Sequence, residues 1–100
     1  ESFAAAADVD WKSVPGFSLV LTDQPAAKAW PLASATFILV HKKAENPAKT
    51  KAALSFFDWA YKNGNDAATK LDYVPLPDTL KSLVREEWKK VTDAQGKAVY

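Results

Sequence analysis

The sequence predicts a piece of an α/β domain, and three observations lead to this expectation. The 100 residues are 48% hydrophobic and 25% charged, which is the composition of a folded globular chain. The run Thr36–Val40 lacks polar alternation, as in a strand that is buried on both faces of a sheet. Apolar residues recur at helical spacing in two later segments, 47–62 and 79–91.

The first quarter of the chain is expected to contain a helix end, a turn and a short strand. Residues 2–11 include four consecutive alanines and predict a helix that has lost its start. Val14-Pro15-Gly16 has the chemistry of a turn, because Pro presets φ and Gly tolerates positive φ. Phe17–Leu21 is expected to be a short strand, and Pro25 prevents regular pairing in the loop that follows.

The main predicted strand runs from Ala35 to His41. A strand that is buried on both faces belongs in a sheet with neighbours at both edges. The chain offers only one other weak strand candidate, at 17–21. We therefore expect the strand at 35–41 to find its partners outside these 100 residues.

A helix is predicted from Pro47 to about Lys62. Asn46 suits the N-cap, and Pro47 suits the first helical position, where its missing N–H would be unpaired anyway. Asn63-Gly64 provides the C-terminal stop, since Gly accepts the left-handed conformation. The expected polar stripe is Lys51, Ser55, Asp58 and Lys62, and the expected apolar face is Ala53, Leu54, Phe56, Phe57, Ala60 and Tyr61.

Two further helical segments are predicted. Residues 66–71 are expected to form a short helical turn, and two prolines hold 74–77 extended. Asp78 is expected to cap a helix from Thr79 to about Val91. Its core positions are Leu80, Leu83, Val84, Trp88 and Val91. The side chains expected to face water are Arg85, Glu86, Lys89 and Lys90, with Glu86 and Lys90 at a favourable i,i+4 spacing.

Composition excludes several classes of protein. A net charge of +1 without a basic stripe argues against a nucleic-acid partner. The absence of cysteine excludes a disulfide scaffold and thiolate chemistry. No apolar run is long enough to cross a bilayer, and no signal peptide is visible.

No set of side chains predicts catalysis or metal binding. His41 is the single histidine, and without a second histidine or a cysteine it is expected to be a half-solvated residue at a strand end. Glu86 and Glu87 point in different directions on a helix and form no acid–base pair by themselves. The helix start at Asn46 could hold an anion, but Pro47 removes one donor.

Aromatic residues are concentrated on the helix predicted at 47–62. A carbohydrate-stacking platform and a hydrophobic core are the two alternatives for this set, and helical spacing favours the core. Trp59 is the member expected to be only half buried. The set consists of Phe56, Phe57, Trp59 and Tyr61.

Five stretches, read in order, resemble one family. They are LTDQ at 21–24, AWPLASATFILVHK at 29–42, FFDWAYKNG at 56–64, LDYVPLPD at 71–78 and GKAVY at 96–100. Together they resemble the C-terminal third of the periplasmic phosphate-binding protein, the solute receptor of bacterial phosphate ABC transporters. The resemblance covers nearly the whole chain.

The resemblance implies two α/β lobes joined by hinge strands, with inorganic phosphate bound in the cleft. Residues 1–28 would end the second lobe, 29–32 would cross the hinge, and 33–100 would form the C-terminal part of the first lobe. The unpartnered strand at 36–40 would then pair with the missing N-terminal part. The resemblance also implies a monomeric periplasmic receptor, not an enzyme and without a cofactor, that docks on a membrane permease.

The phosphate ligands of the resembled family come from earlier in the chain. They are Thr, Ser, Asp and Arg side chains and backbone N–H groups at a Ser-Gly-Thr helix start, and none of these motifs is present here. We therefore assign no catalytic, ligand-binding or metal-binding residue to this sequence. Ser34 and Thr36 lie near the expected crossing and are given a packing or hinge role. The implied mechanism is hinge closure on a largely dehydrated phosphate.

Two alternatives remain open. A phosphate-handling enzyme on the same fold would need a nucleophile or metal set outside these residues, and turnover of a phosphoester would reveal it. A stand-alone interaction domain with exposed aromatic residues would unfold cooperatively as a 100-residue chain.

We expect the isolated 100-residue chain to be aggregated or poorly ordered, because its strand and helices leave much apolar surface uncovered. Thermal melting followed by circular dichroism, together with NMR, checks this. A sharp transition with dispersed NMR signals would contradict the expectation.

Overall fold

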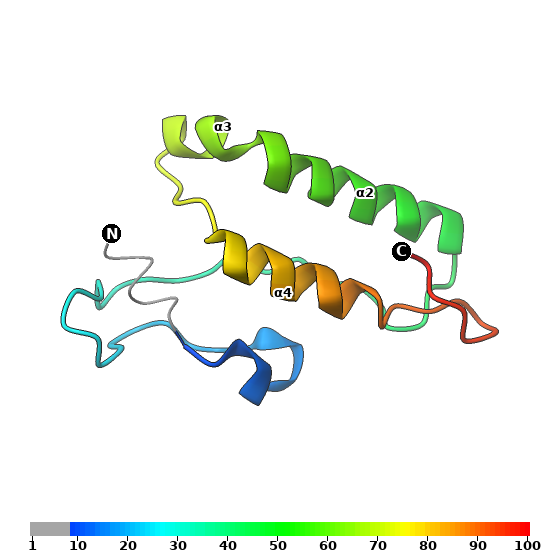
Figure 1. Cartoon of the computed structure of the whole chain (residues 1–100), viewed down its shortest axis with the longest axis horizontal. Helices are drawn as coiled ribbons and strands as arrows, with labels where there is room; N and C mark the ends of the chain where they lie inside the picture. Colours follow the sequence, from blue (N-terminus) through cyan, green and yellow to red (C-terminus); the bar gives the residue numbers. More distant parts are fainter. Residues whose placement is uncertain (1–8) are drawn as a thin grey trace. The chain divides into compact units, whose positions relative to one another are not determined.

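The computed structural model describes residues 9–100, and within them it contains helical elements but no strand (Figure 1). The predicted helix at 2–11 lies largely outside the described residues. The chain divides into two compact units, which meet between Phe37 and Ile38 and are described separately. The elements are the 3-10 turns η1 (Trp11–Ser13) and η2 (Pro15–Phe17) and the α-helices α2 (Pro47–Asn63), α3 (Asn65–Lys70) and α4 (Asp78–Trp88).

The first unit forms turns where a strand was predicted at 17–21. The turn at 14–16 is confirmed, and the N–H of Phe17 donates to the carbonyl of Val14 at 3.1 Å. Both Gly16 and Phe17 have positive φ, 67° and 55°. Positive φ reverses the chain direction, so the strand prediction for 17–21 is not confirmed. Trp11 is buried and meets Phe17 edge-on, with 6.3 Å between ring centroids.

The predicted strand at 35–41 is likewise not confirmed. A strand exists only through the hydrogen bonds of a neighbour. No backbone hydrogen bond joins residues 35–41 to another segment within the described range. The apolar side chains of this segment are exposed, and Leu39 reaches 93%. That this segment finds its partners outside these 100 residues stays a prediction.

Helix α2 begins and ends where the local signals predict. The side-chain oxygen of Asn46 accepts a hydrogen bond from the N–H of Lys49 at 3.0 Å, so Asn46 is the N-cap. Gly64 follows the last helical residue but has φ −92°, so the expected left-handed stop is wrong. Glycine fits there for a different reason, because a Cβ would lie 2.6 Å from the carbonyl oxygen of Ala60.

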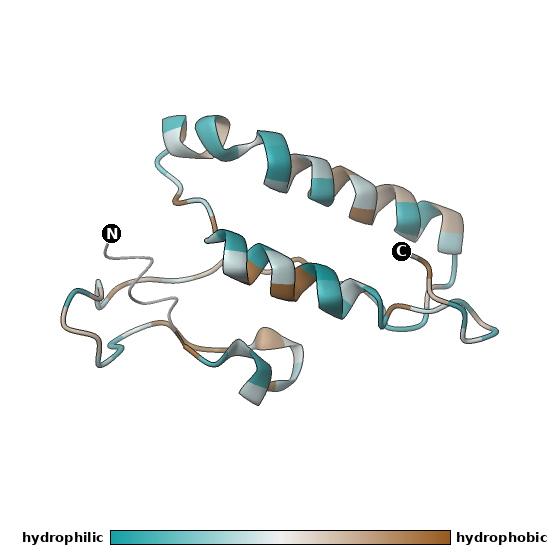
Figure 2. Cartoon of the chain, in the orientation of Figure 1, coloured by the Kyte–Doolittle hydropathy of each residue, from teal (hydrophilic) through white to brown (hydrophobic). Residues whose placement is uncertain are grey.

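Helix α3 confirms the predicted helical turn, whereas α4 differs from its prediction at both ends. Pro77 occupies the N-cap position, and Asp78 is the first helical residue and makes no side-chain cap. The helix ends at Trp88, short of the expected Val91, and brown and teal residues alternate along it (Figure 2). Because the chain leaves the helix at Trp88, Lys90 is placed beside Glu87 at 2.5 Å rather than beside Glu86.

The second unit is built around α2 and α4, which run side by side in opposite directions (Figure 1). The chain after α4 returns to the segment before α2 and forms isolated β-bridges there. Thr92 pairs with Lys43 in parallel orientation and with Ala98 in antiparallel orientation. These bridges enclose a small buried cluster of Ala44, Val91 and Val99.

Substitution of Leu54 tests this packing. Leu54 on α2 is 1% exposed, so Leu54→Ala should lower the free energy of unfolding by about 2–5 kcal/mol. Urea denaturation of the full-length protein that carries this segment measures the change. The matched control is Lys51→Ala on the exposed side of the same helix, with an expected change within about 0.5 kcal/mol. Equal effects of the two substitutions would contradict the assigned burial.

Candidate functional site

Residues 9–100 contain no group of three or more His, Cys, Asp or Glu side chains that could hold a metal ion. His41, Ser34 and Thr36 are all exposed, and the structure does not gather them into a site. Glu86 and Glu87 each pair with a lysine instead of with each other. Among the described helices, none combines the length and apolar character that a membrane span requires.

A shallow hollow of about 430 Å³ lies between residues 38–41 and the first turns of α2. Its polar edge carries His41, Glu45, Asn46, Lys49 and Thr50. The Asn46 side-chain oxygen accepts the cap hydrogen bond from the N–H of Lys49, and Pro47 has no N–H to donate at this helix start. Most of the lining is apolar, with Ile38, Leu39, Val40, Ala44, Ala53, Leu54 and Phe57. The hollow therefore suits an apolar side chain better than phosphate.

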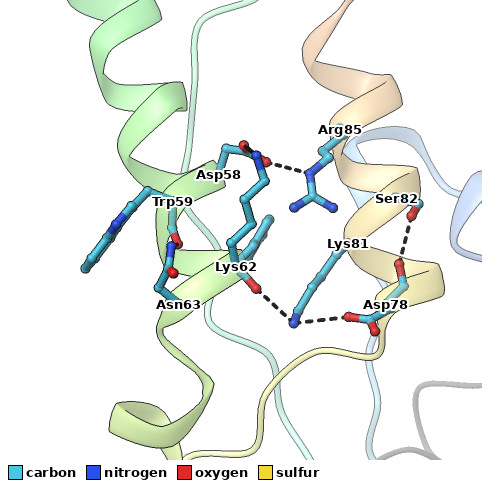
Figure 3. Close-up of polar contacts among 9 residues, drawn as sticks. Asp58, Trp59, Lys62, Asn63, Asp78, Lys81, Ser82 and Arg85 are labelled. Carbon is cyan, nitrogen blue, oxygen red and sulfur yellow. Dashed lines mark hydrogen bonds and ion pairs between the residues drawn. The ribbon is translucent and has the colours of Figure 1, made fainter.

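The charged centre of the second unit is Asp58 on α2, which is 9% exposed (Figure 3). Arg85 on α4 donates its Nε–H to the carboxylate at 2.6 Å, and Lys62 on α2 forms an ion pair with it at 2.5 Å. Hydrogen bonds from Lys62 and Arg85 lower the pKa of Asp58 to about 2. The sequence placed Asp58 and Arg85 on water-facing stripes, and both expectations are wrong because the two helices pack through these residues.

A second cation, Lys81 on α4, is 3% exposed. Its Nζ donates to the carbonyl oxygen of Tyr61 and to Oδ1 of Asn65, both at 3.1 Å, and lies 3.3 Å from Oδ1 of Asp78. These three oxygens satisfy the buried ammonium group. The sequence reading missed Lys81, although it shares a helical face with Trp88 at i+7.

An aromatic column continues from this network. Tyr61 and Trp88 are stacked with 5.8 Å between ring centroids, and Tyr100 meets Trp88 edge-on at 5.4 Å. The guanidinium carbon of Arg85 lies 5.8 Å from the Tyr61 ring centroid. Burial raises the pKa of Tyr61. The column ties the C-terminal residue to both helices.

The aromatic set on α2 is divided by the fold. Tyr61 and Phe57 are partly buried, as a core requires. Trp59 is 58% exposed, in agreement with the prediction that it is only half buried. Phe56 is 60% exposed, so it does not belong to the core of this unit. Figure 3 shows the Trp59 ring pointing away from the contact between Asp58 and Arg85.

Comparison with known proteins gives no match to any protein-family model. It does give several curated relatives that carry the name phosphate-binding protein PstS. The protein from Pasteurella multocida is 47% identical over 102 residues, which cover 100% of this chain and 30% of the relative. The protein from Haemophilus influenzae is 47% identical over 90 residues, with coverages of 89% and 27%. The protein from Xylella fastidiosa strain 9a5c is 43% identical over 89 residues, with coverages of 88% and 24%.

These matches confirm the family resemblance seen in the sequence. The class of protein to which the chain is similar is that of the phosphate-binding proteins. Within this class, the chain is homologous to the C-terminal part of the phosphate-binding proteins. It spans between 24% and 30% of the length of the relatives named above.

The Asp58 network predicts a dependence of stability on pH. The pKa of Asp58 falls from 3.8 to about 2 on folding, so its ion pairs stabilise the protein fully above pH 3.8. This contribution is lost as the pH falls through about 2. Replacing Asp58 by Asn should remove the part of the acid destabilisation that arises in this window. Urea unfolding midpoints of the full-length protein that carries this segment, measured between pH 5 and pH 2, check the expectation.

The matched control is Asp66→Asn, which changes an exposed carboxylate on α3. This variant should retain the acid sensitivity of the parent protein. Equal acid sensitivity in the parent protein and in Asp58→Asn would contradict a stabilising role for the network.

Proposed function

We propose that this chain is the C-terminal part of a periplasmic receptor that binds inorganic phosphate and delivers it to an ABC transporter. The observation that carries the proposal is the identity of 43–47% to proteins named phosphate-binding protein PstS, over 88–100% of this chain. The name that these relatives share describes binding, and we propose that the receptor is a monomer and not an enzyme.

The proposed architecture is two α/β lobes with phosphate in the cleft between them. Residues 1–28 would belong to the second lobe, 29–32 to the hinge crossing and 33–100 to the first lobe. The boundary between the two compact units, at Phe37 and Ile38, lies shortly after this crossing and supports the division. The exposed apolar segment at 36–40 supports a strand that pairs with the earlier part of the first lobe.

In this proposal, phosphate is held by residues outside the present chain. The hollow beside α2 is mostly apolar, which supports the proposal. The role of residues 38–100 is mechanical. The ion pair between Asp58 and Arg85 and the hydrogen bond from Lys81 to the Tyr61 carbonyl fasten α2 to α4, so this unit moves as part of one lobe when the hinge closes on a dehydrated phosphate.

Calorimetric titration with inorganic phosphate tests the proposal on the full-length receptor that carries this segment. The expected result is saturable binding at one site, and no heat of binding for the 100-residue chain alone. Hydrolysis of p-nitrophenyl phosphate by the full-length protein, or the absence of phosphate binding, would overturn the proposal.

Substitution of His41 in the full-length receptor separates a ligand role from a structural one. His41→Ala should change the phosphate Kd by less than about fivefold, which corresponds to about 1 kcal/mol, because the exposed imidazole is not assigned to the ligand set. Thr36→Ala is the parallel variant at the proposed crossing. A loss of binding in His41→Ala, with unchanged circular dichroism, would show that the assignment is wrong.

A further inference from the structure

Helix α2 carries apolar side chains on two opposite sides. The side toward α4 presents Leu54 and Tyr61 around the buried Asp58. Residues two positions apart on a helix are rotated by about 200° around its axis, so Phe56 lies opposite Leu54. Helical spacing places Ala48, Ala52, Phe56 and Trp59 together on this second side, which is called the outer face of α2 below.

The outer face is exposed, with Lys49 and Lys62 at its borders and Asn63 one turn beyond Trp59. Phe56 and Trp59 are 60% and 58% exposed, and their rings are stacked with 6.1 Å between centroids. Ala48 and Ala52 are also exposed, and their small side chains permit close approach of another element. A helix that carries apolar side chains on two opposite sides, bordered by polar ones such as Lys51 and Ser55, is suited to packing against a neighbour on each apolar side.

Helix α4 provides the contrast within the same unit. Its buried side carries Leu80 and Trp88, and its exposed side carries Ser82 and Glu86. Lys89, just past its end, pairs with Glu86 at 2.8 Å. This is the pattern of a helix with one side in water. The two helices therefore differ, and within residues 9–100 the outer face of α2 stays exposed.

We infer that the outer face of α2 packs against the earlier part of the same receptor polypeptide, so that α2 is a middle layer between α4 and the remainder of the first lobe. The inference rests on the proposed function. It commits to this occupant because the chain spans only 30% of the Pasteurella multocida relative, which leaves most of a receptor to cover the face.

Two other occupants fit the face less well. A second copy would bury mainly two aromatic residues from each chain, about 150–250 Å² apiece. Four such residues do not reach the roughly 1,200 Å² at which stable interfaces begin. An oligosaccharide needs free polar groups beside the stacking rings, and the polar neighbours of Trp59 are already engaged, since Asn63 donates to the Trp59 carbonyl and Lys62 pairs with Asp58.

Hydroxyl-radical footprinting of the full-length receptor, read by mass spectrometry, tests the inference without any substitution. Oxidation of Phe56 and Trp59 is compared between the native receptor and the receptor unfolded in urea. Trp88, which is 9% exposed, is the internal standard for a buried tryptophan. The expected result is that Trp59 is protected at least as strongly as Trp88, in a sample that elutes as a monomer.

Oxidation of Trp59 at the same rate in native and unfolded receptor would overturn the inference. Protection that appears only in a dimer fraction would overturn it as well, and would assign the face to a second copy. Phosphate titration of the same sample keeps the two proposals apart. A receptor that binds phosphate but leaves Trp59 unprotected retains the proposed function and loses this inference.

Discussion

The ion pair between Asp58 and Arg85 sets the register of α2 against α4, and the other contacts of the unit are arranged around it. A nearly buried carboxylate is tolerated only when its charge is compensated, and here a guanidinium from α4 and an ammonium from α2 compensate it. The same guanidinium lies over the Tyr61 ring, which stacks on Trp88. A shift of either helix would break polar and aromatic contacts together.

Each end of the helix pair is closed by a different kind of contact. Near α3, the buried ammonium of Lys81 donates to oxygens of Tyr61 and Asn65 and pairs with Asp78, so it joins residues from both ends of the connection between α2 and α4. At the other end the contact is between backbone groups, because the N–H of Thr92 donates to the carbonyl oxygen of Lys42 at 2.9 Å. The unit is therefore held by specific polar contacts rather than by a large apolar core, since its buried cluster is small.

Local signals in the sequence predicted the helices, whereas contacts between residues far apart in the sequence could not be predicted. Asn46 and Pro47 define a helix start by themselves, and the structure confirms it. The packing of two helices decides which polar side chains become buried between them, and a helical pattern alone does not show this packing. Asp58 and Arg85 were therefore predicted to face water. The strand at 36–40 stayed unconfirmed because pairing is a property of two segments. The family resemblance came from five motifs in a fixed order along the sequence, and one helix or strand alone would not have revealed it.

Polar and apolar contacts are completed to different degrees in this chain. Among the described residues, no buried side-chain nitrogen or oxygen lacks a hydrogen-bond partner. Apolar burial is less complete, since Leu39, Phe56 and Trp59 are all more than half exposed. Hydrogen bonds fix geometry but add little net stability, while burial contributes about 25 cal/mol per Å² of apolar surface. Hydrogen bonds within the chain therefore fix how α2 and α4 pack together. The stability of the chain depends on the surfaces that cover the segment at 36–40 and the outer face of α2.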